Sequence, residues 1–449
     1  MFSWHRRPKD NGLFLGRLFE DGKVGNEVHY REPIHAITIG PNGSGKGTRL
    51  IIPNLAELPR SIFIIDPKAE ALAITGRARA KLGRVHIMNG FNVLADELPH
   101  LKSHGYNPQT DLDARSDDFV DDATLMGLSM VPERGSGGSG DSHFFNTSAQ
   151  ALVTALLMRE KIRNGKDANL ANVRRALTQP FTESGLQATI SEMADSPCEP
   201  LRSKAGRFVN GSRSTMDVIS TAINETNFLD SPPIQRDLRG PGFDWNLMKR
   251  EIVTVYLVLP ADRLESHANY LRLIVTSALR SLLRSPPGET LPPVLFILDE
   301  FAALGYLPPI ENAAGIARGF GVQLWPILQD LNQLKALYRD RWQTFIGNAG
   351  LLTAFAPRDW FTAKYLSDLC GQKLRNVRSR SMSDEGRVNW NDAPHEFPRF
   401  RPEDLMRMPQ GQMLCLAAGV PLPFFTQVPG YWNTRQGRDL DPNPYFKPN

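Results

Sequence analysis

The stretch "HAITIGPNGSGKGT", residues 35–48, joins an apolar run to a glycine-rich loop, and this junction decides the fold. Gly40, Gly45 and Lys46 stand at the spacing of a phosphate-binding loop, whose glycines let successive backbone N–H groups turn toward phosphate oxygens. The apolar run is typical of a strand, and "TRLIIPNL" after the loop can open a helix whose dipole attracts anions. The stretch therefore predicts a strand, a phosphate loop and a helix, with a chance Gly-rich turn as the alternative.

Further apolar runs without alternation recur along the chain. Each is rich in Ile, Val, Leu or Phe, as expected for strands that are buried on both faces of a parallel sheet. They lie at residues 35–40, 61–66, 84–88, 251–260, 293–300, 322–328 and 351–356. Between them are helical patterns such as residues 268–284, in which apolar residues recur every three or four positions. These features predict an α/β fold with a doubly wound, mostly parallel sheet.

Strand patterns are missing between about residue 110 and residue 245. Helical patterns replace them, notably at residues 146–163 and 170–180, which indicates an all-α insertion. A chain of 449 residues is long enough for two domains or for one large domain with such an insertion. We therefore predict four segments. They are a nucleotide-binding domain in two parts, 1–112 and 246–432, an inserted all-α domain, 113–245, and a C-terminal tail, 433–449.

Composition and charge narrow the class of protein. Lys plus Arg number 52 and Asp plus Glu number 48, so the net charge of +4 permits attraction to nucleic acid but does not demand it. Cys198, Cys370 and Cys415 are too far apart for a disulfide framework or a zinc knuckle, which favours a reducing cytoplasm. No apolar stretch approaches the roughly 20 residues that span a bilayer, and the N-terminus lacks the apolar core of a signal peptide. We expect a protein that is neither exported nor membrane-spanning.

A second motif supports a nucleotide site. The run "PPVLFILDEFAALG", residues 292–305, ends its apolar part with Asp299 and Glu300. Carboxylates at the end of a buried strand need a partner, because burying an unpaired charge is costly. In a nucleotide hydrolase Asp299 would hold Mg²⁺, directly or through water, and Glu300 would act as general base toward the attacking water. The alternative is a helix cap that follows an ordinary strand.

The loop departs from the usual pattern directly after its lysine. Gly47 stands where Ser or Thr normally ligates Mg²⁺, and the hydroxyl comes one residue later, on Thr48. The ion can still be held by nucleotide phosphates, water and Asp299, because Mg²⁺ commonly keeps several waters. We therefore interpret the site as altered, not necessarily broken. The residues expected to bind the nucleotide are Gly40, Pro41, Asn42, Gly43, Ser44, Gly45, Lys46, Gly47 and Thr48.

Two more polar residues flank the strand at 322–328. Arg318 precedes it, where an arginine finger offered to a neighbouring subunit's nucleotide would lie, although a surface arginine is the alternative. Gln329 follows the strand, on the edge of a parallel sheet where ligands bind, and would sense the γ-phosphate. With Lys46, Asp299 and Glu300, these residues form the predicted catalytic set.

The motifs together resemble the type IV coupling proteins, the TraG/TraD-like ATPases that feed DNA or protein into conjugation and type IV secretion machines. "GPNGSGKGTRLIIPNL" is similar to that family's phosphate loop, including the glycine after the lysine. "SIFIIDPKAEAL" resembles the family's strand with Asp66, Lys68 and Glu70, and "DEFAALG" and "ARGFGVQLWPILQDLNQL" resemble its acidic, Arg and Gln elements. The resemblance covers residues 12–432. Family members usually begin with a transmembrane anchor, whereas this chain starts almost directly at the sheet.

The resemblance implies a RecA-like P-loop domain with an inserted all-α domain, and a ring of six copies with ATP and Mg²⁺ between subunits. It further implies a place at the cytoplasmic face of the inner membrane, with inner-membrane components of the secretion machine as partners. The cargo would be single-stranded DNA with its attached relaxase, or an effector protein. Support for DNA from the residues is weaker. Lys373, Arg375, Arg378 and Arg380 bunch within residues 373–387, either to bind phosphates without reading sequence or as a solvated charged loop.

Two functions remain open at this point. The first is a motor, an ATP-driven translocase of single-stranded DNA. The second is a receptor that recruits protein cargo through the helical domain and uses ATP only to change shape. ATP turnover that is stimulated by DNA would favour the motor, and turnover stimulated only by cargo protein would favour the receptor.

Overall fold

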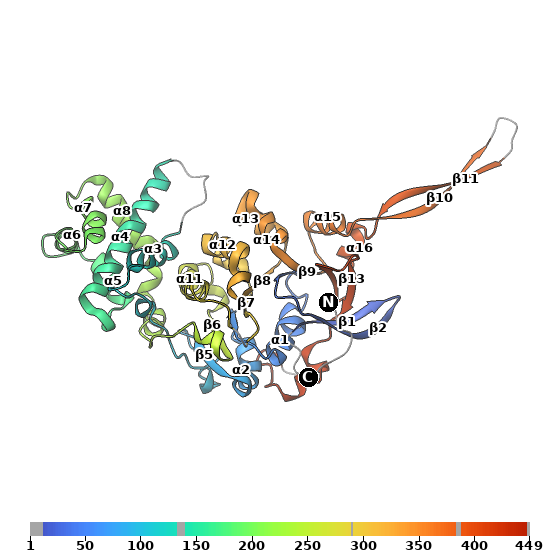
Figure 1. The fold of residues 1–449 in the computed structure, drawn as a ribbon, viewed down its shortest axis with the longest axis horizontal. Helices are drawn as coiled ribbons and strands as arrows, with labels where there is room; N and C mark the ends of the chain where they lie inside the picture. Colours follow the sequence, from blue (N-terminus) through green and yellow to red (C-terminus); the bar gives the residue numbers. More distant parts are fainter. Residues whose placement is uncertain (1–11, 133–139, 289–290, 383–387, 447–449) are drawn as a thin grey trace. The chain divides into compact units, whose positions relative to one another are not determined.

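The structure is a computed structural model that describes residues 12–132, 140–288, 291–382 and 388–446 (Figure 1). The chain divides into two compact units. Unit 1 comprises residues 1–54 and 327–438, and unit 2 comprises residues 55–326 and 439–449. Strand β8 (Val322–Leu328) passes from unit 2 into unit 1. Each unit is therefore described separately.

The sheet of unit 1 has the strand order β2-β1-β13-β12-β9-β3-β8. Its central strand β3 pairs in parallel with β9 on one side and with the last two residues of β8 on the other. The remaining neighbours are antiparallel. The bounds are β1 Leu13–Glu20, β2 Lys23–Tyr30, β3 His35–Ile39, β9 Ala349–Phe355, β12 Gln412–Ala417 and β13 Phe424–Gln427. Every residue of β3 is buried, as expected for a central strand.

Two helices of unit 1, α13 (Leu331–Tyr338) and α15 (Trp360–Leu369), begin at a capping side chain. Asp330 accepts a hydrogen bond from the backbone N–H of Gln333, and Asp359 accepts one from that of Thr362. A π-helical turn, η1 (Lys46–Ile51), follows the phosphate loop and continues as α1 (Ile52–Glu57). The other helices are α14 Trp342–Asn348 and α16 Pro402–Met406.

Within the basic segment 373–387, residues 373–382 form part of a strand and not of a solvated loop. This strand is β10 (Gln372–Met382), which pairs with β11 (Val388–Pro398) in a two-stranded antiparallel ribbon that projects beyond α15 and α16 (Figure 1). Arg378 forms an ion pair with Asp392 at 2.9 Å and lies 5.7 Å from the ring centre of Trp390. One of the bunched arginines is therefore already paired. Residues 383–387 lie outside the described part of the chain.

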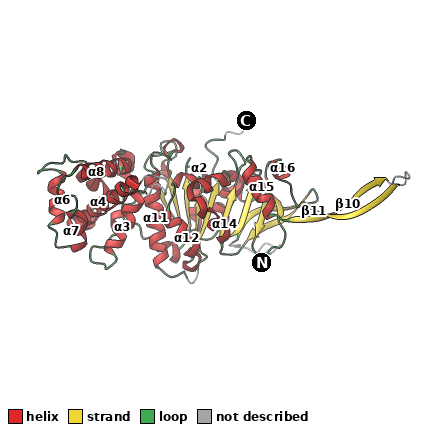
Figure 2. Cartoon of the chain, turned by 90° about the horizontal axis from the view of Figure 1, so that it is seen from above, coloured by secondary structure: helices red, strands yellow, loops and turns green. Residues whose placement is uncertain are grey.

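The sheet of unit 2 is entirely parallel, in the order β8-β7-β4-β6-β5. Its strands are β4 Ile62–Asp66, β5 Arg84–Met88, β6 Val253–Val258 and β7 Val294–Leu298. Figure 2 shows α2 (Glu70–Leu82) on one side of these strands and α11 (Ala268–Arg284) and α12 (Pro308–Ile316) on the other. The predicted doubly wound, mostly parallel sheet is confirmed.

The segment between β5 and β6 consists of helices, turns and irregular loops, and contains no strand within its described residues. Its helices are α3 Phe119–Met130, α4 Gly140–Asn164, α5 Leu170–Leu177, α6 Leu186–Ala194, α7 Glu199–Gly206, α8 Arg213–Glu225 and α9 Pro232–Asp237, and the short α10 Leu247–Arg250 leads into β6. The predicted all-α insertion is therefore present. Its predicted boundaries, 113 and 245, both fall within unit 2 and stay a prediction, because the compact units divide the chain elsewhere.

Candidate functional site

The phosphate loop of unit 1 begins where β3 ends. The N–H of Gly40 donates to the carbonyl of Leu328 at 2.9 Å, which fastens the start of the loop to β8. Gly43 and Gly45 have φ angles of 79° and 88°, a backbone conformation that favours glycine. A Cβ at Gly45 would also lie 2.7 Å from Cδ of Arg49. The glycines are thus required by the shape of the loop.

Lys46, Gly47 and Thr48 form the first turn of the helix that follows the loop. A Cβ added at Gly47 would meet no atom within 4 Å, and its φ lies outside the left-handed range. Gly47 is therefore not needed for backbone geometry, unlike Gly43 and Gly45. Lys46, Gly47 and Thr48 are all half-buried, as the predicted site requires.

Gln329 lies on the β8 flank of the loop. It directly follows Leu328, whose carbonyl accepts the N–H of Gly40, and its own N–H donates to Oε1 of Gln333 at 3.0 Å. Gln329 is half-buried at the carboxyl end of β8. Unit 1 therefore brings together two predicted elements, the loop with Lys46 and Gln329.

A cavity of 340 Å³ opens on the β9 flank of the loop, and we call it the loop cavity. It is lined by residues 41, 43 and 44 of the loop, by residues 355, 356 and 358 at the end of β9, and by residues 406 and 408–412 before and at the start of β12. Ser44 Oγ is buried in the described structure without a hydrogen-bond partner. Because buried hydroxyls are normally hydrogen-bonded, this atom indicates that a polar ligand group belongs here.

The predicted carboxylates lie in unit 2. Asp299 and Glu300 directly follow β7 and are half-buried, and Glu300 has a left-handed φ of 55°. Asp66 ends the adjacent strand β4, so that it shares their sheet edge. Burial raises the pKa of Asp66 to about 7, and the charge of Asp299 adds to the rise, while the N–H of Leu72 lowers it. Unit 2 therefore gathers acidic groups at the edge where parallel sheets bind ligands.

The C-terminal tail contacts the loop that follows Asp66. The hydroxyl of Tyr445 donates to the carbonyl of Lys68 at 2.7 Å, and Nδ2 of Asn443 donates to Oε1 of Glu70 at 2.6 Å. The tail thus packs within unit 2 on residues of the Asp-Pro-Lys-x-Glu element.

Arg318 does not share the edge that carries Asp299. It lies in a short helical turn, Ala317–Phe320, before β8, and its side chain is exposed. Because Val294 of β7 pairs in parallel with Val322 of β8, Arg318 lies at the amino end of these strands, opposite Asp299. Arg318 therefore lies near the amino end of β7, and its role as an arginine finger toward a neighbouring subunit stays a prediction.

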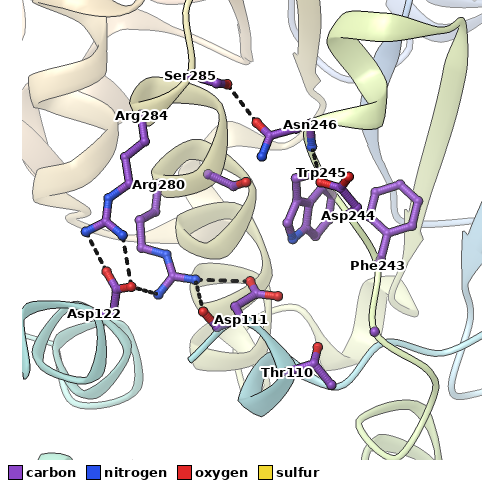
Figure 3. Close-up of a pocket in the computed structure, with 12 residues that line it drawn as sticks. Thr110, Asp111, Asp122, Phe243, Asp244, Trp245, Asn246, Arg280, Arg284 and Ser285 are labelled. Carbon is purple, nitrogen blue, oxygen red and sulfur yellow. Dashed lines mark hydrogen bonds and ion pairs between the residues drawn. The ribbon is translucent and has the colours of Figure 1, made fainter. Parts of the chain in front are cut away.

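A second cavity, of 590 Å³, lies in unit 2 where the helical insertion joins the sheet, and we call it the junction cavity (Figure 3). Arg280 of α11 lies 3.3 Å from Asp111 and 3.5 Å from Asp122, and Arg284 lies 2.6 Å from Asp122. Asp244 pairs with Arg250. The charged residues that line this cavity are thus paired with one another or with a neighbour.

Burial also changes the pKa of an acidic residue that lines this cavity. It raises the pKa of Asp111 to about 6, although the hydrogen bond from Tyr106 and the charge of Arg280 lower it. The hydroxyl of Tyr106 in turn accepts a hydrogen bond from Nε1 of Trp245 at 3.1 Å. No sequence motif indicated this network, because its acidic and basic members lie about 160 residues apart.

The proposed ligands of Mg²⁺ are hard oxygen donors, as that ion prefers. The parts of the chain that the structure describes hold no cluster of three or more His, Cys, Asp or Glu suited to a metal. Asp299 offers a carboxylate in unit 2 and Thr48 a hydroxyl in unit 1, and their predicted role as ligands of Mg²⁺ stays a prediction.

The strand order around β3 and the glycine loop define a P-loop α/β protein with a RecA-like sheet and a helical insertion. The family model for the type IV secretory system conjugative DNA transfer proteins matches residues 6–437. The chain belongs to this family, and the predicted family and fold class are confirmed.

Several curated relatives are similar over most of the chain. The conjugal transfer protein TraG of Rhizobium radiobacter is 25% identical and the protein VirD4 of Agrobacterium fabrum strain C58 is 27% identical, over 86% and 97% of this chain. The matches span 60% and 64% of those proteins' own lengths. Within the described ranges, we find no helix whose length and hydropathy suit a membrane span.

Solved structures of the conjugative coupling protein TrwB share the fold. Its unbound form superposes with a TM-score of 0.64 at 16% identity, over 92% of this chain and 88% of TrwB. Its complex with the non-hydrolysable ATP analogue ADPNP superposes with a TM-score of 0.63, over 95% and 96% of the two chains.

Proposed function

We propose that this chain is an ATP-hydrolysing coupling protein that moves single-stranded DNA, with a bound relaxase, toward a type IV secretion channel. The observation that carries the proposal is the phosphate loop at the end of β3, with its left-handed glycines, Lys46 at the helix start and the buried hydroxyl of Ser44, which has no hydrogen-bond partner in the described structure. Membership of the conjugative DNA transfer family supports DNA as the cargo. TrwB, which shares the fold, binds ADPNP, and in another structure ADP and Mg²⁺.

In the proposed reaction the loop N–H groups and Lys46 bind the outer phosphates of ATP. Thr48 and Asp299 hold Mg²⁺, which supplies charge neutralisation on the phosphates when it is bound. Glu300 accepts the proton of the attacking water, and Gln329 contacts the γ-phosphate. The loop and Asp299 belong to different units, so the proposal requires that both act on one nucleotide.

We propose that the chain assembles into a ring of six, as the family resemblance implies, and the position of Arg318 supports contact with another copy. The side chain is exposed at the strand end opposite Asp299, so that it is suited to a nucleotide bound by another copy. ATP would then lie at subunit boundaries, and DNA would pass through the centre of the ring. Such a ring would act at the cytoplasmic face of the inner membrane, with membrane components of the secretion system as partners.

The test is the rate of ATP hydrolysis with and without single-stranded DNA. We expect DNA to raise the rate of the full chain severalfold, and Glu300→Gln to lower it by about 10²–10⁴-fold with unchanged ATP affinity, because an amide cannot accept the proton. Stimulation only by a relaxase or an effector protein would instead assign the receptor function. Hydrolysis that is unchanged by DNA and by cargo would contradict both.

A further inference from the structure

The two-stranded ribbon of unit 1 has two faces that the register of its strands defines. Strands β10 and β11 pair without a shift, from Gln372 opposite Pro398 to Met382 opposite Val388. Successive side chains of a strand point to opposite faces, so the odd-numbered residues of both strands share one face and the even-numbered residues share the other. We call these the odd face and the even face. Within the described residues no third strand pairs with the ribbon, so both faces are open to a ligand.

The even face holds the carboxylates of the ribbon. Asp392 and Glu396 are the two acidic residues of β10 and β11, and both have even numbers. Arg378 lies on the same face and forms its ion pair with Asp392 there. The charge of this arginine is therefore already compensated.

The odd face carries cations and no carboxylate. Lys373 and Arg375 of β10 lie on it, and neither forms an ion pair within the described structure. Their partners across the ribbon are both rings, Phe397 opposite Lys373 and His395 opposite Arg375. Arg375 and His395 are exposed, and Lys373 and Phe397 are half-buried. The odd face thus presents a row of two cations beside a row of two rings.

This combination of cations and rings suits a single-stranded nucleic acid. Proteins that bind single strands without reading their sequence use cations for the phosphates and aromatic rings on which the bases stack. Two residues along a strand advance about 6.6 Å, which is close to the separation of successive phosphates in an extended single strand. Lys373 and Arg375 are therefore spaced to contact neighbouring phosphates.

We propose that the odd face of the ribbon binds single-stranded DNA, with Lys373 and Arg375 on successive phosphates and Phe397 and His395 against the bases. Binding of this kind does not depend on the base sequence, because its contacts go to phosphates and to ring faces. The assignment deepens the proposed function, on whose DNA cargo it rests, but it needs no nucleotide on the phosphate loop.

The experiment measures the affinity of the full chain for a fluorescent single-stranded DNA by anisotropy, without nucleotide, over a series of salt concentrations. Replacing Lys373 and Arg375 together by Ala should weaken binding about tenfold or more. The plot of log affinity against log salt should become shallower by about 1.4, because each phosphate contact of a single strand contributes about 0.7 to its slope. Phe397→Leu keeps an apolar side chain but removes the ring, and should weaken binding about fivefold without changing the slope.

The even face supplies matched controls. Arg378→Ala removes the same charge from the same strand as Arg375→Ala does, but from the face where the charge is already paired. Trp390→Leu removes an exposed ring of β11 from that face. Both controls should change DNA affinity by less than about twofold, because charges that do not contact the DNA are largely screened by salt.

Several results would overturn the assignment. If the double variant binds DNA as tightly as the original chain, or loses binding only to vesicles of phosphatidylglycerol, DNA lies elsewhere. If Arg378→Ala weakens binding as much as Arg375→Ala, net charge and not the odd face is responsible. In these cases ATP hydrolysis of the original chain that is stimulated by DNA keeps the proposed function. If the original chain neither binds single-stranded DNA nor is stimulated by it, the DNA cargo and this assignment fail together.

Discussion

The loop cavity and the junction cavity differ in how their polar groups are satisfied. The junction cavity is the larger, 590 Å³ against 340 Å³, yet its arginines and carboxylates pair with one another (Figure 3). The loop cavity is smaller, but the buried hydroxyl of Ser44 has no partner in the described structure. Buried groups that satisfy each other stabilise a fold, whereas an unsatisfied group indicates a ligand. Volume alone would therefore not have selected the loop cavity as the candidate site.

The largest expected effect concerns the loop. Lys46→Ala should lower ATP turnover by about 10²-fold or more, because the lysine contacts phosphates and not the core. Steady-state phosphate release measures the effect, and circular dichroism checks that the fold is intact. Lys364→Ala is the matched control, since that lysine is exposed on α15 and pairs only with Asp368. Unaltered turnover in Lys46→Ala would remove the loop from the proposed site.

The second-largest effect is expected from a substitution in the junction cavity, which should change the stability of the protein without changing nucleotide binding. Asp122→Ala removes a carboxylate that pairs with Arg280 and Arg284, and should lower the free energy of unfolding by about 3 kcal/mol. Asp118→Ala is the control, because Asp118 is mostly exposed and contacts Arg284 only at 3.7 Å. Thermal unfolding with and without ATP measures the stability and the ATP binding of each variant. Weaker ATP binding in a stable Asp122→Ala variant would make the junction cavity a ligand site.

A smaller effect is a dependence of stability on pH. The pKa of Asp111 is raised to about 6, above its value in the unfolded chain, so the folded protein binds the proton more tightly. The contribution is therefore fully present below about pH 4 and is lost as the pH rises through 6, by about 3 kcal/mol. Asp111→Asn should flatten this part of the profile, as measured by denaturant unfolding between pH 4 and pH 7. If the free energy of unfolding of Asp111→Asn depends on pH as it does in the original chain, this dependence belongs to another group, such as Asp237, whose pKa is also raised by burial.

The smallest effect is expected at Gly47. Gly47→Ser should leave ATP affinity within about threefold of the original, because a side chain there meets no neighbour and needs no left-handed backbone. Titration of the ATPase activity with Mg²⁺ would show whether the added hydroxyl strengthens Mg²⁺ binding. Loss of nucleotide binding in this variant would mean that the glycine serves the ligand by close approach and not by its conformation.

The parallel core was predictable from the sequence, because its strands are unbroken apolar runs such as Ile62–Asp66 and Val294–Leu298. The antiparallel strands of unit 1 were not predicted. Lys23–Tyr30 is exposed over its first half and Phe424–Gln427 has only four residues, so neither has a clear pattern. The ribbon residues whose burial is described are exposed or half-buried, and the sequence of β10 resembles a charged loop.

The candidate site was predictable only where one motif holds all its parts. The phosphate loop and Asp299 each stand next to a strand in the sequence. The wall of the loop cavity with Met406 and Met408 carries no motif, and it reaches the loop because β12 pairs with β9, which no local pattern indicates. Likewise, the sequence does not show at which end of the strands Arg318 lies, because this depends on the parallel register of β7 and β8.

Photolabelling with 8-azido-ATP tests the difference between the two cavities most directly. The azide on the base should label residues in the ranges 355–358 or 406–412, as read by mass spectrometry of peptides from the full chain. Excess ATP should prevent the labelling, and Lys46→Ala should reduce it. Specific labelling of residues 242–246 or 280–285, which line the junction cavity, would contradict the assignment of the nucleotide to the phosphate loop.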